Sequence, residues 1–292
     1  MNIGLRLHDT SGSNLEEKLK SAHDQGFSCV HIAMSKVVPG FKMAQAPELL
    51  TDALADEVRG LLDKYNQQCV LLGCYLNLCT PDMDAYAHTL DIYRAHLHFA
   101  KKIGAQMVGT ETGAPNTAYK TCPECRTEES LQLFIQRAMP VVRCAEEVGV
   151  TFAIEPVIRH IVYNAERCEC VLNAVHSPNL RVILDAVNLL DRTNVNRADE
   201  VIQDAVRRLG DHVALLHMKD FLPENTPACI HAQQTVANAD MYDGLLSLAP
   251  GLGNMNYRAL LDLAKRRNLP MTLENTNPDN ARQARLYLEA QV

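Results

Sequence analysis

The stretch TFAIEPV, residues 151 to 157, places Glu155 directly behind a short run of strand-forming residues. A carboxylate at such a position either ends the strand without further role or belongs to a site. Nothing within the seven residues decides between these two interpretations. The decision depends on whether other strands of the chain end in the same way.

Short apolar or β-branched runs like this one recur along the chain of 292 residues, with helical stretches between them. Each run is too short for a stable helix, and most are rich in Val, Ile or Leu, as strands buried on both faces are. Eight strands are therefore predicted: NIGLRL (2–7), CVHIAM (29–34), CVLLGCYL (69–76), QMVGTE (106–111), TFAIE (151–155), RVILD (181–185), VALLHM (213–218) and PMTLE (270–274).

Strand followed by helix, eight times, predicts an α/β protein with a single (β/α)8 TIM barrel. The competing architecture is an open doubly wound sheet, which has fewer strands and carries a glycine-rich GxGxxG turn after the first one. No such turn follows the first strand here, and no linker divides the chain, so one barrel domain is expected over residues 1–292. Three long connections, 112–127, 188–198 and 219–256, follow a strand, where barrels build their active sites.

The composition limits the classes of partner. The net charge of −7 argues against nucleic acid, whereas a small polar substrate remains compatible with it. No apolar run approaches the roughly 18 residues of a membrane span, and the N-terminus shows no signal peptide. We therefore expect a cytoplasmic protein without a membrane partner. The oligomeric state stays open, a homo-oligomer included.

One CxxC motif, Cys122 to Cys125, stands among ten cysteines. It could bind zinc or change redox state, but a zinc site needs about four ligands and no second CxxC follows. The motif also follows a polar loop and not a strand. We expect a chance pair of loop cysteines in a reducing compartment.

Four of the later strands end in a residue that can bind a metal ion: Glu155, Asp185, His217 and Glu274. In a barrel these strands are neighbours, and their carboxyl ends point into one pocket. Three carboxylates crowded together repel one another, so a cation is the natural way to keep them ionised. Oxygen-rich ligation with one imidazole favours one divalent ion, with Mn²⁺ expected ahead of Mg²⁺, Co²⁺ or Zn²⁺.

Each of the four residues also has an ordinary structural interpretation. A single acid after a strand is usually a helix cap or a solvated end, and His217 alone would be a buried histidine with satisfied hydrogen bonds. Four such residues at corresponding positions on consecutive strands are hard to assign to chance. The four residues together, and not any one of them alone, therefore indicate a site.

The motifs AIEPV, ILDAVN, HMKDF and LENT, which surround these four residues, resemble those of the sugar phosphate isomerase/epimerase superfamily, the xylose-isomerase-like TIM barrels. The resemblance runs from the first strand to the last helix. It implies that the four residues bind one divalent metal ion. It further implies that Glu155 and Glu274 are catalytic and move protons on opposite faces of a metal-held enediolate.

The function that the resemblance implies is that of a metal-dependent sugar or sugar-phosphate isomerase or epimerase, with a small sugar or sugar acid as substrate. One alternative is an inosose-type dehydratase, in which a β-hydroxyl leaves with help from an acid such as Lys219. Another alternative is a non-catalytic sugar-binding barrel.

Three positions depart from the epimerase pattern. Asn188 stands where a histidine is common, Pro223 where an arginine is, and Leu252 where Glu or Gln is. Asn188 and Lys219 could still bind hydroxyl or carboxylate oxygens of a substrate. Lys219 lies two residues beyond His217, so strand alternation points both side chains inward.

Further substrate-binding candidates come from other strand ends and their loops: His8, Asn77, Glu111 and His160. For His8 and His160 a structural role is the alternative. Glu111, in VGTETG, is expected at the mouth of the barrel, where it could bind sugar hydroxyls or accept backbone hydrogen bonds.

Overall fold

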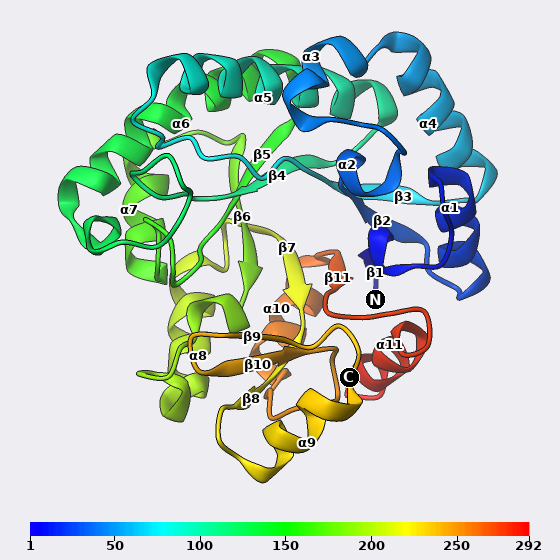
Figure 1. Cartoon of the computed structure of the whole chain (residues 1–292), viewed down its shortest axis with the longest axis vertical. Helices are drawn as coiled ribbons and strands as arrows, with labels where there is room; N and C mark the ends of the chain where they lie inside the picture. The colour runs from blue at the N-terminus through cyan, green and yellow to red at the C-terminus, as the bar shows by residue number, and fades with distance from the viewer. Residues whose placement is uncertain (292) are drawn as a thin grey trace.

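The computed structural model describes residues 1–291 and shows eight parallel strands closed into a barrel (Figure 1). Around the barrel the order is β1-β2-β3-β4-β5-β6-β7-β11, so strands that follow one another along the chain pair in space. The barrel strands are β1 (Ile3–Arg6), β2 (Cys29–Ile32), β3 (Gln68–Gly73), β4 (Met107–Glu111), β5 (Thr151–Glu155), β6 (Leu180–Asp185), β7 (Val213–Met218) and β11 (Met271–Leu273). All eight overlap the predicted runs, which confirms the (β/α)8 barrel.

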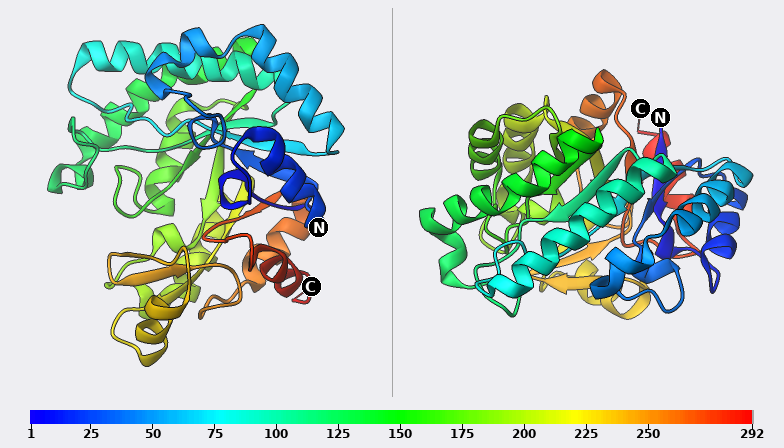
Figure 2. Two further views of the ribbon diagram at one scale, coloured as in Figure 1. Left: turned by 45° about the vertical axis from the view of Figure 1, so that its right-hand side comes forward. Right: turned by 90° about the horizontal axis from the view of Figure 1, so that it is seen from above.

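Helices surround the barrel, as the views in Figures 1 and 2 show. The two longest begin behind Asp82 and Thr127, whose side chains accept hydrogen bonds from backbone N–H groups of the first turn. The helices are α1 (Leu15–Asp24), α2 (Met34–Val37), α3 (Ala46–Leu49), α4 (Asp52–Lys64), α5 (Met83–Ile103), α6 (Glu128–Val148), α7 (Ala165–Val175), α8 (Ala198–Leu209), α9 (Pro227–Thr235), α10 (Arg258–Arg267) and α11 (Ala281–Glu289). Short 3-10 turns are η1 (Leu7–Asp9), η2 (Met43–Gln45), η3 (Pro123–Arg126), η4 (Val187–Leu189) and η5 (Val195–Arg197). Within residues 1–291, no helix is both long and apolar enough to span a membrane.

Side chains of the barrel strands alternate between the interior of the barrel and the layer of helices. On β7, for example, Leu215 packs in the inner apolar cluster, whereas Leu216 and Met218 pack in the outer one. The inner cluster consists of Cys29, Val70, Leu71, Met107, Ala153, Ile183 and Leu215. A side chain two residues beyond an inner residue therefore faces the carboxyl end of the barrel interior.

The connection between β7 and α10 contains structure of its own, where the sequence indicated only a long loop. It forms a three-stranded antiparallel sheet in the order β8-β10-β9, with α9 beside it (Figure 1). The strands are β8 (Asp220–Pro223), β9 (Asp240–Tyr242) and β10 (Leu245–Leu248). We call residues 220–248 the small sheet. Phe221 and Leu245 pack in the outer barrel cluster, whereas five other residues form a cluster separate from the two of the barrel: Leu222, Cys229, Ala232, Leu246 and Leu248.

Asp220 fastens the small sheet to the barrel. Its buried carboxylate accepts hydrogen bonds from the backbone N–H groups of Phe221, Gly251 and Met255. These donors lie at both ends of the segment, so one side chain holds the chain where it leaves the barrel and where it returns.

Candidate functional site

Glu155, Asp185, His217 and Glu274 meet at the carboxyl ends of four neighbouring strands, β5, β6, β7 and β11. Alternation aims the first three inward, because Ala153, Ile183 and Leu215, two residues earlier, belong to the inner cluster. All four are buried. His217 is at the centre: its Nδ1 lies 3.3 Å from Glu155 Oε2 and 3.4 Å from Glu274 Oε1.

The donor atoms form two groups that share His217. In one group donor atoms of Glu155, Asp185 and His217 lie within 4.8 Å of one another, and in the other those of His31, His217 and Glu274 do. Neither ring nitrogen of His217 has a well-aligned hydrogen bond among the described residues, although both are buried. Unpartnered buried nitrogens are costly unless something else binds them. The donor set therefore fits a divalent ion, which these residues could hold.

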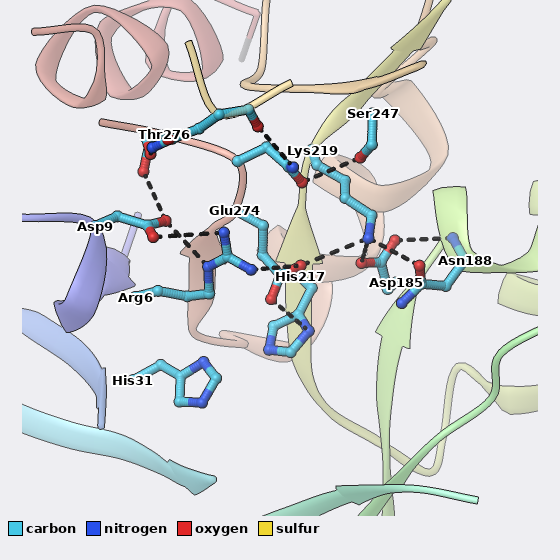
Figure 3. Close-up of polar contacts among 12 residues, drawn as sticks. Arg6, Asp9, His31, Asp185, Asn188, His217, Lys219, Ser247, Glu274 and Thr276 are labelled. Atoms are coloured by element: carbon cyan, nitrogen blue, oxygen red, sulfur yellow. Dashed lines mark hydrogen bonds and ion pairs between the residues drawn. The ribbon is translucent and has the colours of Figure 1, made fainter. Parts of the chain in front are cut away.

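Lys219 also lies among the carboxylates. Its Nζ is 2.8 Å from Asp185 Oδ2 and 3.5 Å from Glu274 Oε2 (Figure 3). Burial alone would lower the pKa of Lys219, but Asp185 and the other acids around it outweigh burial and raise that pKa well above its usual range. The side chain points inward beside His217, as strand alternation predicted. Lys219 thus supplies part of the positive charge beside these carboxylates, for which the sequence predicted a metal ion alone.

Asn188 connects Glu155 to Lys219. Its Nδ2 donates to Glu155 Oε1 over 2.6 Å, while its Oδ1 accepts from Lys219 Nζ at 2.8 Å and from Tyr242 OH at 3.1 Å. Tyr242 comes from β9 of the small sheet. The amide is thus engaged with protein groups at both ends, so this structure gives Asn188 the task of orienting Glu155. Direct substrate binding by Asn188 stays a prediction.

Glu274 lies between two cations. Figure 3 shows Arg6 on one side of its carboxylate and Lys219 on the other, and Arg6 Nη1 is 3.6 Å from Glu274 Oε2. Burial opposes ionisation of Glu274, but His217 and Arg6 outweigh it and lower the pKa of Glu274 well below its usual range. Burial raises the pKa of Asp185 to about 6, even though Lys219 opposes this. The surroundings thus lower the pKa of Glu274 and raise the pKa of Asp185.

A cavity of about 290 Å³ opens at this end of the barrel. It is bordered by both predicted proton-transfer residues, Glu155 and Glu274, whereas Asp185 and His217 are buried behind its lining. The other side chains at its border come from several elements: Arg6, His8, His31, Ala33, Lys36, Tyr75, Glu111, Arg159, Asn188, Lys219, Asp240, Tyr242 and Asn275. Asp240 and Tyr242 belong to the small sheet, which therefore forms part of the cavity wall.

His8 and Glu111 border the cavity, and substrate binding by them stays a prediction. Burial, with help from Arg6, lowers the pKa of His8 to about 4, so its imidazole is neutral at pH 7. Burial and the nearby Glu155 raise the pKa of Glu111 to about 7. A carboxyl group that is partly protonated near neutral pH can both donate and accept hydrogen bonds.

Asn77 and His160 do not border the cavity. Asn77 is engaged with the backbone of the loop after β4: its Nδ2 donates to the carbonyls of Ala114 and Asn116, and its Oδ1 accepts from the N–H groups of Cys79 and Ala114. The loop thus uses the hydrogen-bonding groups of Asn77, and substrate binding by Asn77 stays a prediction.

His160 lies against Glu111, which borders the cavity, but does not border the cavity itself. Its ring stacks on Tyr119 with 5.4 Å between centroids, and its Nδ1 is 3.5 Å from Glu111 Oε2. Its contact with the cavity is therefore indirect, through Glu111. The structural alternative raised for His160 describes this position better than substrate contact does.

Three residues that contact the proposed metal ligands or Asn188 were not among the predicted residues: Arg6, His31 and Tyr242. Arg6 and His31 lie inside predicted strands, whereas the predicted site residues lie at strand ends or in the loops that follow them. Alternation along NIGLRL and CVHIAM is the signal that could have indicated them. Tyr242 gives no such signal, because it enters the site through the small sheet.

Cys122 and Cys125 remain thiols, with 3.7 Å between their sulfur atoms. No group of three donor residues within the described part of the chain includes either of them.

A parallel (β/α)8 barrel with buried acids and imidazoles at its carboxyl end defines the class of this protein. Within that class, residues 19–291 match the family model described as xylose isomerase-like TIM barrel, and the chain belongs to this family. The predicted resemblance is thereby confirmed. A search of curated proteins gives no match.

Solved structures with the same fold include sugar epimerases and a dehydratase. The 3-keto-D-glucoside 4-epimerase YcjR from E. coli is 15% identical, covers 99% of each chain and has a TM-score of 0.69. The probable 3-DHS dehydratase AsbF from Bacillus anthracis is 13% identical over 100% of this chain and 98% of its own, with a TM-score of 0.71. The IolI protein, solved with a zinc atom, is 17% identical over 100% and 97%, with a TM-score of 0.69. At these identities the likeness establishes the fold alone.

Proposed function

We propose that this protein is a divalent-metal-dependent isomerase or epimerase that acts on a small sugar, a sugar acid or their phosphates. The observation that carries the proposal is the pair Glu155 and Glu274. Both border the cavity, and both hold a carboxylate oxygen within 3.4 Å of His217 Nδ1. Two acids that border one cavity are suited to remove a proton from a substrate and return one.

Glu155, Asp185, His217 and Glu274 would hold the ion, and Mn²⁺ is the first ion to test, ahead of Mg²⁺, Co²⁺ and Zn²⁺. When bound, a divalent ion supplies Lewis acidity, which makes a hydrogen next to a carbonyl group more acidic. We place the protein in the cytoplasm, with a sugar or sugar acid as its small-molecule partner.

The chain's own residues would then handle the proton. Asn188 holds Glu155 in one orientation through its 2.6 Å hydrogen bond, and Arg6 and Lys219 keep Glu274 ionised. One glutamate would take the proton from a carbon next to the carbonyl, and the other would deliver a proton to the opposite face. Return to the same carbon inverts it, as in an epimerase. Delivery to the former carbonyl carbon moves the carbonyl, as in an isomerase, when the first carbon bears a hydroxyl whose proton passes to the former carbonyl oxygen.

The test is exchange of carbon-bound hydrogen with solvent deuterium. The Mn²⁺-loaded protein would be incubated in D₂O with a panel of ketoses, keto acids and sugar phosphates, and the products analysed by mass spectrometry and NMR. We expect deuterium next to the carbonyl of at least one compound. Glu274→Gln should abolish this exchange and leave the circular dichroism spectrum unchanged, whereas Glu166→Gln, an exposed change on α7, should have no effect. Unchanged exchange in Glu274→Gln would rule out the role given to Glu274.

A dehydratase is the second candidate, and Lys219 is the observation that favours it. Its ammonium group borders the cavity and could protonate a hydroxyl group that leaves from the carbon next to the enolised one. Incubation with an inosose distinguishes the two reactions, because elimination removes one water from the product mass and isomerisation does not. For a dehydratase, Lys219→Met should stop the loss of water while proton exchange continues.

A further inference from the structure

His31 is a buried imidazole inside the barrel that the proposed reaction does not use. It lies on β2, two residues after Cys29 of the inner cluster, while Val30 and Ile32 on either side pack in the outer cluster. Alternation therefore aims His31 into the barrel interior, where its residue is 2% exposed. A polar ring so placed needs partners.

The ring of His31 lies against that of His217. The two rings are nearly parallel, with an interplanar angle of 10° and 5.6 Å between centroids, and Figure 3 shows them side by side. One donor atom each of His31, His217 and Glu274 lies within 4.8 Å of the other two. His31 Nδ1 has no hydrogen-bond partner in the described part of the chain. One ring nitrogen of His31 thus belongs to a group of donors that includes two of the proposed metal ligands, and its Nδ1 is free to bind.

The surroundings of His31 hold its ring in place. Tyr75 OH lies 3.3 Å from His31 Nε2, so one ring nitrogen is occupied and the other is left free. Gly73 makes room for this pair, because a Cβ atom there would lie 2.7 Å from His31 Nε2 and 2.6 Å from Tyr75 Cε2. Metal-binding histidines are commonly oriented by a partner on their second nitrogen in this way.

A packing role alone describes His31 less well. His96, inside α5, is also buried with one unpartnered nitrogen, but no metal-binding group within residues 1–291 includes it. Only two such groups are present in that part of the chain, and His31 belongs to one of them. What distinguishes His31 is that it combines a free nitrogen with a place in a group of donors.

We infer that His31 is a further ligand of the divalent ion, an inference that rests on the proposed function. A second imidazole makes the donor set more nitrogen-rich. Nitrogen ligands favour Co²⁺ and Zn²⁺, whereas Mg²⁺ prefers oxygen. The site should therefore bind Co²⁺ and Zn²⁺ through His31 and depend on it much less for Mg²⁺.

The test measures metal binding and not activity. Affinities of the metal-free protein and of His31→Phe for Co²⁺, Zn²⁺ and Mg²⁺ would be determined by competition with a chelator, together with the visible absorption spectrum of the Co²⁺ form. We expect His31→Phe to weaken Co²⁺ and Zn²⁺ binding by at least about tenfold, the lower end of what lost support of a metal site costs. The Co²⁺ bands should also shift, while Mg²⁺ affinity changes little.

His8→Phe is the matched control, because His8 lies edge-on to His31, 6.2 Å between centroids, but belongs to neither donor group. Its Co²⁺ spectrum should equal that of the unaltered protein. His31→Gln serves as a second variant if His31→Phe does not fold, with the same expected losses. Equal affinities and spectra in the His31 variants would overturn the inference and leave the proposed function standing. Failure of the unaltered protein to bind any of the three ions would overturn both.

Discussion

Asn188 is the residue that fixes the direction of the Glu155 carboxylate. Its amide donates to Glu155 and accepts from Lys219 and Tyr242, so it links these three residues in one hydrogen-bond network. Where the epimerase pattern has a histidine, this chain has an asparagine whose amide donates a hydrogen bond to Glu155, a proposed catalytic residue. The substitution therefore changes how the proposed base is held and not whether it is present.

Replacing Asn188 by Ala tests this role. The variant leaves Glu155 Oε1 without its 2.6 Å hydrogen bond. We expect the rate of proton exchange at saturating substrate to fall by roughly 10- to 100-fold, because misorientation of a reacting group costs on that scale. The KM should change much less. Asn188→His, which restores a ring N–H donor, should recover part of the rate; an unaltered rate in Asn188→Ala would contradict the positioning role.

Lys219 should matter most when no metal ion is bound. In Lys219→Met, Asp185 and Glu274 lose a buried cation, and removing one partner of a buried ion pair costs about 3–5 kcal/mol. We expect a loss of that order in the free energy of unfolding by urea with chelator present, and a much smaller loss with saturating Mn²⁺. Lys36→Met is the control, since Lys36 borders the same cavity but is exposed. An equal loss with and without Mn²⁺ would show that no ion compensates these carboxylates.

The four proposed ligands could be predicted from sequence because each stands at the end of a run that is plainly a strand. Arg6 and His31 could not be found in that way. Each lies inside an apolar run, and only the phase of alternation shows that it faces the same interior as the ligands. The hydrogen bonds between Asn77 and the loop after β4 could not be predicted from the sequence either, because the partners Ala114 and Asn116 are distant along the chain.

At the scale of elements, the small sheet is the part that differs from a plain barrel. It contributes Asp240 and Tyr242 to the cavity, yet its apolar cluster is separate from those of the barrel. Regions with a small core of their own open locally more readily than the main core. The small sheet forms one wall of the cavity, and we therefore expect it to open locally more readily than the barrel.

Hydrogen exchange measured by mass spectrometry checks this. We expect amides of β9 and β10 to exchange faster than those of β5, β6 and β7. Leu246→Ala, which removes part of the small sheet's cluster, should speed exchange in residues 220–248 and leave the barrel strands unaffected. Protection of β10 equal to that of β7 would show that the small sheet opens only with the whole barrel.

The eight barrel strands could be predicted because parallel strands are buried on both faces and read as continuous apolar runs. In the small sheet β10 is also a short, mostly apolar run with all four residues buried, but β8 and β9 carry no such pattern. β9 is exposed at Asp240 and Met241, and β8 begins with the buried acid Asp220. β8 and β9 are strands because they pair with β10, and their own residues do not indicate this pairing.

At the scale of the whole molecule, buried neutral histidines make stability depend on pH. His96 is fully buried, its Nδ1 bonds the Ile92 carbonyl, and burial lowers its pKa to about 4. In the unfolded chain the pKa is near 6.5, so between about pH 6.5 and pH 4 the unfolded state binds more protons. Stability is therefore lost as the pH falls through this window.

Urea unfolding of His96→Leu at pH 7 and pH 4.5 measures the contribution. We expect the loss of unfolding free energy between the two pH values to shrink by on the order of 2 kcal/mol in the variant. His8 and His160, whose pKa values burial also lowers to about 4, keep part of the dependence. His88→Leu, an exposed change on the same helix, is the control. The same pH dependence in His96→Leu and in the unaltered protein would contradict the assignment.

The central claim is that the ends of β5, β6, β7 and β11 hold one divalent ion beside the substrate cavity. Anomalous diffraction from crystals grown with Mn²⁺ and a polyol tests it most directly. The account predicts one anomalous peak bounded by Glu155, Asp185, His217 and Glu274, with the polyol in the adjoining cavity. Crystals with no peak there, and with Lys219 alone between Asp185 and Glu274, would contradict it.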